Sequence, residues 1–209
     1  MSFFKNFFSK QLPIEVRESF DEINRKIEKN RNDSDLYTQS AKKDADLLMQ
    51  RSSMYIEIEE YGKALDDLNR VIELDGNNGH AYVSRGVAYQ GKEDYDKAKS
   101  DFEKAISINS SIKQAFNNIG LVLVEEKKHK EAIERYTKAI EIDGSYASAL
   151  DNRGYAYMVM GNRSQACEDW AKACELGLPE SYNKACKLGL CESSTARLEK
   201  KEPAKPDVF

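Results

Sequence analysis

The chain has 209 residues, of which 40% are hydrophobic and 33% are charged, and its formal net charge is −4. This composition is too apolar for a wholly disordered chain and too thinly apolar for one deep core, so an elongated fold is expected. The negative charge disfavours nucleic-acid binding. The chain has no run of 18 apolar residues, so a membrane-spanning helix is not expected. Only two histidines are present, His80 and His129, which leaves little basis for histidine catalysis.

Residues 1–12 are rich in phenylalanine, with Phe3, Phe4, Phe7 and Phe8 on one side of a helix. Lys5 and Lys10 fall off that stripe and interrupt any apolar core of signal-peptide length, so we expect a cytoplasmic protein, or one peripheral to a membrane. The segment suits three roles: a docking or capping helix, an interfacial helix at a membrane, or a disordered arm.

Pro13 is expected to open a further helix that ends near Asn30–Asp35. Its apolar residues recur at helical spacing and would pack on the element that follows: Val16, Phe20, Ile23 and Ile27. Residues 1–44 are thus interpreted as an N-terminal helical extension.

The following 136 residues repeat one pattern four times, with a period of 34, in units 45–78, 79–112, 113–146 and 147–180. The eighth position of each unit holds a small residue: Ser52, Gly86, Gly120 and Gly154. The twenty-fourth holds a large apolar one: Leu68, Phe102, Tyr136 and Trp170. Apolar spacings of three, four and seven predict helices, and each unit breaks near its middle and its end. Each unit is therefore predicted to be a helix, a turn and a second helix, stacked on its neighbours.

Two further columns change together from unit to unit. The seventh position holds Arg51, Arg85, Ile119 and Arg153, and the twenty-third holds Asp67, Asp101, Arg135 and Asp169. Each repeat with arginine at the seventh position has aspartate at the twenty-third. This predicts a structural guanidinium–carboxylate pair between helices; the alternative is that the joint change arose by chance.

After the fourth unit, residues 181–191 are predicted to form a capping helix, and residues 192–209 a disordered tail. All four cysteines lie near this end: Cys167, Cys174, Cys186 and Cys191. Cys167 and Cys174 share a helix face turned toward the closing helix. Buried reduced cysteines are the favoured interpretation, with a disulfide to Cys186 or Cys191, or a metal site, as alternatives.

The four units resemble tetratricopeptide repeats, a resemblance that covers residues 45–180. It implies an all-α fold, an α-solenoid of four tandem helix-turn-helix repeats between the N-terminal extension and the capping helix. The proline that this family often carries near the repeat end is replaced by Gly76, Ser110, Gly144 and Leu178, so the helix ends must be capped in another way.

The resemblance also implies that six positions on the first helix of each repeat face a concave groove. The candidates for peptide binding there are Ser84, Gln114, Asn117, Asn118, Leu121, Asp151, Asn152 and Tyr155. Asparagine amides both donate and accept, so they can hold a peptide backbone of any sequence, and Asp151 would favour basic over acidic ligands. The alternative is a solvated helix face.

Related repeats that grip acidic chaperone tails need two lysines and an arginine at defined groove positions, where this chain has Met49, Gln114 and Asn118, and asparagines at two more, where it has Ser53 and Ser84. A chaperone-tail clamp is therefore not expected.

We expect a non-enzymatic adaptor or scaffold that binds a protein or peptide in the groove, with no cofactor, metal or nucleic acid. The alternative function is a membrane-peripheral or self-associating assembly factor acting through the phenylalanine-rich N-terminus.

Overall fold

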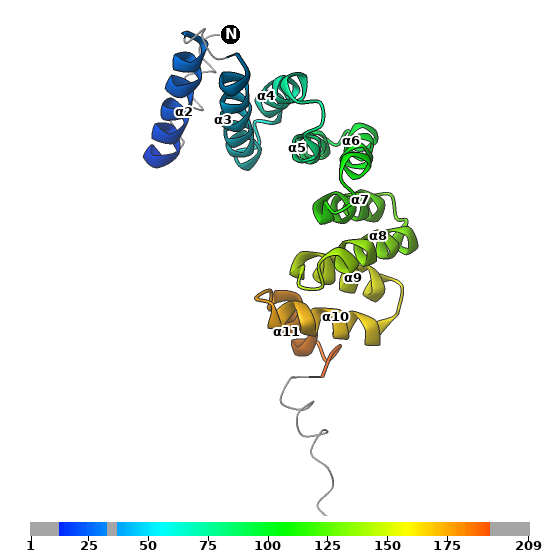
Figure 1. The fold of residues 1–209 in the computed structure, drawn as a ribbon. Helices are drawn as coiled ribbons and strands as arrows, with labels where there is room; N and C mark the ends of the chain where they lie inside the picture. Colours follow the sequence, from blue (N-terminus) through cyan, green and yellow to red (C-terminus); the bar gives the residue numbers. More distant parts are fainter. Residues whose placement is uncertain (1–12, 33–36, 193–209) are drawn as a thin grey trace, which may run out of the picture. The chain divides into compact units, whose positions relative to one another are not determined.

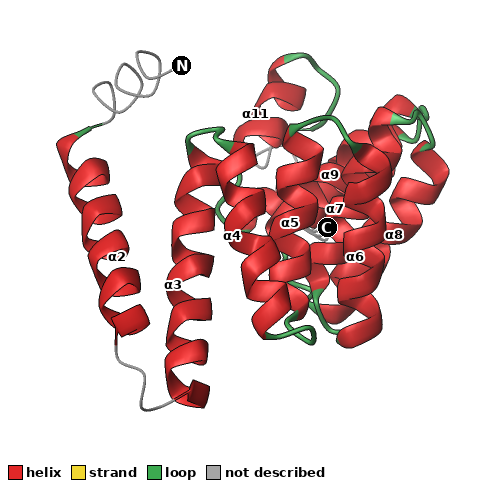
Figure 2. Ribbon diagram, turned by 90° about the horizontal axis from the view of Figure 1, so that it is seen from above, coloured by secondary structure: helices red, strands yellow, loops and turns green. Residues whose placement is uncertain are grey.

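The computed structural model describes residues 13–32 and 37–192, and every regular element in those ranges is an α-helix (Figures 1 and 2). The expected phenylalanine-rich stripe and the expected disordered tail beyond residue 192 lie outside the described residues. The chain divides into two compact units, Met1–Ser110 and Ser111–Phe209.

The described residues of the first unit form five helices. Their bounds are α2 Ile14–Asn32, α3 Tyr37–Glu57, α4 Tyr61–Leu74, α5 Gly79–Gly91 and α6 Tyr95–Ile108. Helix α3 packs chiefly on α4 and α5 chiefly on α6, so each pair is a helical hairpin, and α4 joins the two hairpins by packing on α5. The helix α3 runs through residue 45, where the first repeat was expected to begin.

Residues 111–192, the described part of the second unit, also form five helices. Their bounds are α7 Lys113–Glu125, α8 His129–Ile142, α9 Ala147–Val159, α10 Arg163–Glu175 and α11 Glu180–Lys187. Helices α7 and α8 form one hairpin and α9 and α10 another, while α8 packs on α9 and α11 on α10. The all-α repeat architecture predicted from the 34-residue period is confirmed.

The extension before the repeats packs on the first hairpin, as its apolar spacing predicted. Helix α2 lies beside α3 in Figures 1 and 2. Ile23 and Ile27 of α2 are buried in one cluster with Ala45 and Leu48 of α3, and the ring centroids of Phe20 and Tyr55 lie 4.9 Å apart. The buried face of α2 thus packs against α3, in a cluster that also contains Val71 of α4 and Ala81 of α5.

The small residues at the eighth repeat position make room for aromatic rings. A methyl group on Gly86 would lie 2.5 Å from the Phe102 ring, and one on Gly154 would lie 2.7 Å from the Trp170 ring. The first repeat has Leu68 in place of the ring and tolerates Ser52, which is fully buried and donates to the Met49 carbonyl oxygen. The two helices of a hairpin approach closely because one column is small where the other is bulky.

The turn inside each hairpin places one residue in the left-handed region, always at the fifteenth repeat position. These residues are Glu59, Glu93, Lys127 and Gly161, with φ between 60° and 81°. Only the fourth repeat has a glycine there, although this conformation disfavours side chains with a Cβ. Between repeats, Asp75 and Asp143 accept hydrogen bonds from the backbone N–H two residues later, which stabilises these turns without the missing proline.

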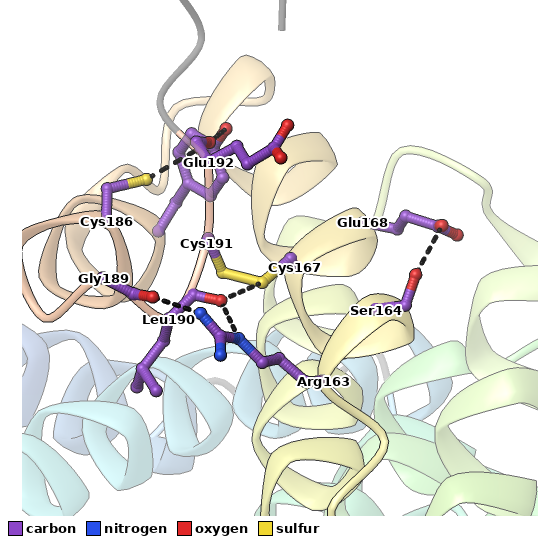
Figure 3. Close-up of a disulfide and its surroundings, with 10 residues drawn as sticks. Arg163, Ser164, Cys167, Glu168, Cys186, Gly189, Leu190, Cys191 and Glu192 are labelled. Atoms are coloured by element: carbon purple, nitrogen blue, oxygen red, sulfur yellow. Dashed lines mark hydrogen bonds between the residues drawn. A yellow bond between two sulfur atoms is a disulfide. The ribbon is translucent and has the colours of Figure 1, made fainter. Parts of the chain in front are cut away.

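A disulfide closes the C-terminal end, joining Cys167 of α10 to Cys191, 24 residues later (Figure 3). Arg163 donates to the backbone carbonyls of Gly189 and Leu190 beside it. The favoured expectation of four reduced cysteines is therefore wrong for this pair, and the alternative of a bond from Cys167 to Cys191 is correct. Cys174 and Cys186 are free thiols, packed against the cluster that contains Trp170 and Tyr182.

Candidate functional site

The three predicted peptide-binding asparagines form one hydrogen-bonded relay between α7 and α9. The side-chain amide of Asn152 donates to the Asn117 oxygen at 3.0 Å, and the Asn117 amide donates to the Asn118 oxygen at 3.2 Å. Asn117 is 5% exposed, so it serves as the buried centre of the relay. Asn118 and Asn152 are half-buried at its two ends.

The relay leaves hydrogen-bonding capacity at its ends. Asn152 keeps its side-chain oxygen as an acceptor, and Asn118 keeps its side-chain N–H groups as donors, because neither makes a further bond within the described residues. One acceptor and one donor, held by a rigid centre, match the N–H and C=O groups of a peptide backbone. The sequence predicted these three residues but not that Asn117 is buried and bonded to the other two.

Asp151 and Tyr155 lie on α9 next to this relay. Asp151, Tyr155 and Val159 are spaced four residues apart, so they share one side of the helix, and Tyr155 and Val159 are 54% and 48% exposed. One carboxylate oxygen of Asp151 is buried and accepts no hydrogen bond from the described residues. The indole N–H of Trp170 donates to the backbone carbonyl oxygen of Asp151 at 3.1 Å, and not to its carboxylate.

The remaining predicted residues, Gln114, Leu121 and Ser84, take no part in the asparagine relay. Leu121 lies one turn beyond Asn117 on α7, Gln114 lies one turn before it, and both are half-buried. Ser84 is half-buried on α5, which belongs to the first unit. The structure thus brings Asn117, Asn118 and Asn152 into direct contact, and leaves Ser84 with the other unit.

The predicted arginine–aspartate pairs exist, and each lies within its own repeat. In all three pairs the guanidinium donates twice to the carboxylate, at 2.5–2.8 Å: Arg51–Asp67, Arg85–Asp101 and Arg153–Asp169. The hydrogen bonds from the carboxylate raise the pKa of each arginine above its usual range. The aspartates are only 6–8% exposed, so these pairs belong to the scaffold.

Each of these arginines also reaches the preceding helix. A third guanidinium N–H group donates to the Asn24 oxygen of α2 from Arg51, to Asn69 of α4 from Arg85, and to the Thr137 hydroxyl of α8 from Arg153. One side chain therefore joins three helices, which helps to hold α9 rigid where it carries the candidate site.

Within residues 13–32 and 37–192, no group of three or more histidine, cysteine or acidic side chains is arranged to hold a metal ion. No helix in the same part of the chain is long and apolar enough to cross a membrane. The absence of a cofactor and of enzymatic activity stays a prediction.

The fold and its periodic sequence define a tetratricopeptide repeat protein, and comparison with known families agrees. Models described as "Tetratricopeptide repeat" match residues 45–78 and 80–111, and one described as "TPR repeat" matches residues 120–161. Together they cover just over half of the chain, which belongs to this family.

Solved structures with a similar fold include the crystal structure of MamA, with 26% sequence identity and a TM-score of 0.56 over 77% of this chain and 96% of that one. PilF from Pseudomonas aeruginosa has 20% identity and a TM-score of 0.63 over 79% of each chain. The first TPR of Spaghetti (RPAP3), bound to the HSP90 peptide SRMEEVD, has 21% identity and a TM-score of 0.53 over 57% of this chain and 94% of that one. No curated protein gives a significant match. The fold is one that supports protein–protein interaction.

Proposed function

We propose that this protein is a non-enzymatic interaction module that binds an extended segment of a partner protein across α7 and α9. The observation that carries the proposal is the asparagine relay, which presents an unused acceptor on Asn152 and unused donors on Asn118. A peptide backbone in an extended conformation offers the complementary groups at every residue, so these contacts would fix its register, and the exposed Tyr155 and Val159 would supply apolar contacts.

The partner is not expected to be an acidic chaperone tail. The only basic residues of α7 and α9 are Lys113 and Arg153, and each is already paired, Lys113 with Asp143 and Arg153 with Asp169. The peptide SRMEEVD, which is bound in the RPAP3 structure, is therefore a useful negative probe: this chain should not retain it.

The test is selection of 12-residue peptides from a random displayed library on the immobilised full chain, followed by affinity measurement with two double variants. Asn118→Ala with Asn152→Ala removes both ends of the relay, and Asn77→Ala with Asn183→Ala makes the same chemical changes at exposed positions outside it. We expect the first double variant to lose at least about tenfold in affinity, since each hydrogen bond contributes about 1 kcal/mol, and the second to bind as the native chain does.

The first double variant leaves the Asn117 amide without partners, so its helical content and melting temperature are measured alongside. Tyr155→Ala is a second probe, because this exposed side chain can be removed without touching the core. Selected peptides that bind equally well to the native chain, the Asn118/Asn152 variant and Tyr155→Ala would show that the site lies elsewhere.

A further inference from the structure

The side of α9 next to the asparagine relay carries a negative charge that nothing in the described chain neutralises. Asp151 accepts no hydrogen bond there, and one of its oxygens is buried. A carboxylate oxygen withdrawn from water without a donor raises the free energy of the folded state. A ligand that brings a donor or a positive charge to Asp151 would remove that cost.

Helices α7 and α9 offer no free positive charge of their own. Lys113 of α7 is bonded to Asp143 and also lies over the Tyr146 ring, with 4.9 Å from its Nζ atom to the ring centroid. Arg153 of α9 is bonded to Asp169 and Thr137. The other charged residue of α7 is Glu125, exposed at the end of the helix. On α7 and α9 both cations are therefore committed to the scaffold, and the remaining charged residues are acidic.

Tyr155 stands one turn beyond Asp151 on the same side of α9 with more than half of its surface exposed. A tyrosine ring attracts cations to its face, and its apolar surface suits the methylene stem of a long basic side chain. A carboxylate followed at four residues by an open aromatic ring thus matches the two ends of an arginine or lysine, with the charged head at Asp151 and the stem along Tyr155.

We infer that the partner segment presents a basic side chain, arginine or lysine, to Asp151 and Tyr155, while its backbone is held by Asn118 and Asn152. The inference rests on the proposed function, and adds the chemistry that selects the partner: basic, with apolar flanking residues. Charge complementarity decides the occupant, since an acidic segment would meet Asp151 and Glu125 with no free cation on α7 or α9.

The experiment uses the full chain and synthetic pools of acetylated, amidated pentapeptides with a fixed central residue and uncharged residues at the other positions. Four pools carry arginine, lysine, leucine or glutamate at the centre, and the fraction retained by the immobilised protein is measured by mass spectrometry. We expect the arginine and lysine pools to be retained at least tenfold better than the glutamate pool, with a preference that weakens as salt is raised.

Asp151→Asn keeps the shape of the side chain and removes its charge, and Glu134→Gln makes the same change at an exposed position of α8. The preference for basic pools should fall to within about twofold in Asp151→Asn and persist in Glu134→Gln. Asp151→Lys should reverse it in favour of the glutamate pool.

The outcomes separate the two proposals. If the native chain retains all four pools equally, or Asp151→Asn keeps the full preference, the basic specificity is wrong while the peptide-binding function stands. If no pool is retained more strongly than on the Asn118/Asn152 double variant, the proposed function itself fails.

Discussion

The second and third repeats solve the same packing problem at their seventh position in different ways. In the second repeat, Arg85 is half-buried and donates twice to Asp101, which is 6% exposed. In the third repeat, Ile119 replaces the arginine and is 2% exposed, while Arg135 replaces the aspartate and is exposed to water. The position is thus inside the fold in both repeats, and it holds either a neutralised charge or no charge.

This difference shows that the residues at the seventh and twenty-third positions contribute to stability together and not separately. A partly buried ion pair costs desolvation energy that its hydrogen bonds offset, so replacing both partners is tolerated far better than removing one. The eighth and twenty-fourth positions behave in the same way: glycine accompanies an aromatic ring in three repeats, and Ser52 accompanies the smaller Leu68 in the first.

The largest effect is expected from breaking one pair. Asp101→Ala leaves the Arg85 guanidinium half-buried without its carboxylate, and should lower the free energy of unfolding by about 3 kcal/mol. Arg85→Ile together with Asp101→Arg gives the second repeat the residues of the third and should recover more than half of that loss. Urea unfolding measures both, with the exposed Glu103→Ala as the control on the same helix. Equal losses in the single and double variants would contradict the comparison.

An intermediate effect is expected at the glycine column. Gly86→Ser gives the second repeat the residue of the first, but its side chain would collide with the Phe102 ring. We expect a loss of about 2 kcal/mol, the usual range for an overpacked core. Adding Phe102→Leu makes room for the serine, so the double variant should be more stable than the sum of the two single effects predicts. Strict additivity in thermal unfolding would show that the two columns are independent.

The smallest effect concerns a contact within the third repeat, between the first residue of α7 and the residue that follows α8. Lys113 is bonded to Asp143, and this bond, together with those from Ser145, holds the pKa of Asp143 well below its usual value of 3.8. A depressed folded-state pKa means that the contribution to stability is present above the unfolded value and is lost as the pH falls below it.

The native chain should therefore be more stable than Asp143→Asn at pH 7, and this advantage should shrink as the pH falls below about 4. Thermal unfolding of the two proteins at several pH values measures it, with the exposed Asp96→Asn as a control. An advantage that stays constant down to pH 3 would show that the Asp143 carboxylate has no depressed pKa.

The periodic part of this fold could be predicted from the sequence because the same residue types recur at the same positions of four repeats. Four copies of one pattern indicated the helical hairpins, and the joint change at Ile119 and Arg135 indicated the ion pair. The disulfide could not be predicted in this way, because Cys191 lies after the repeats and has no counterpart in them. The left-handed turn residues Glu59 and Glu93 were also hidden, since only Gly161 carries the usual signal for that conformation.

The sequence could predict which residues make up the candidate site, but not the hydrogen bonds between them. Helical spacing and the family resemblance brought Asn117, Asn118 and Asn152 to one face, but which amide bonds which depends on side-chain conformation. The unpartnered oxygen of Asp151 is likewise a property of the packed structure, because it exists only where neighbouring helices exclude water and supply no donor.

The central claim is that the free ends of the asparagine relay hold the backbone of a partner segment. Side-chain amide NMR signals of Asn118 and Asn152, followed while a library-selected peptide is titrated into the full chain, test it most directly. The claim predicts that these two signals shift in step with binding while those of the exposed Asn77 and Asn183 stay in place. Saturating binding that leaves the Asn118 and Asn152 signals unmoved would contradict it.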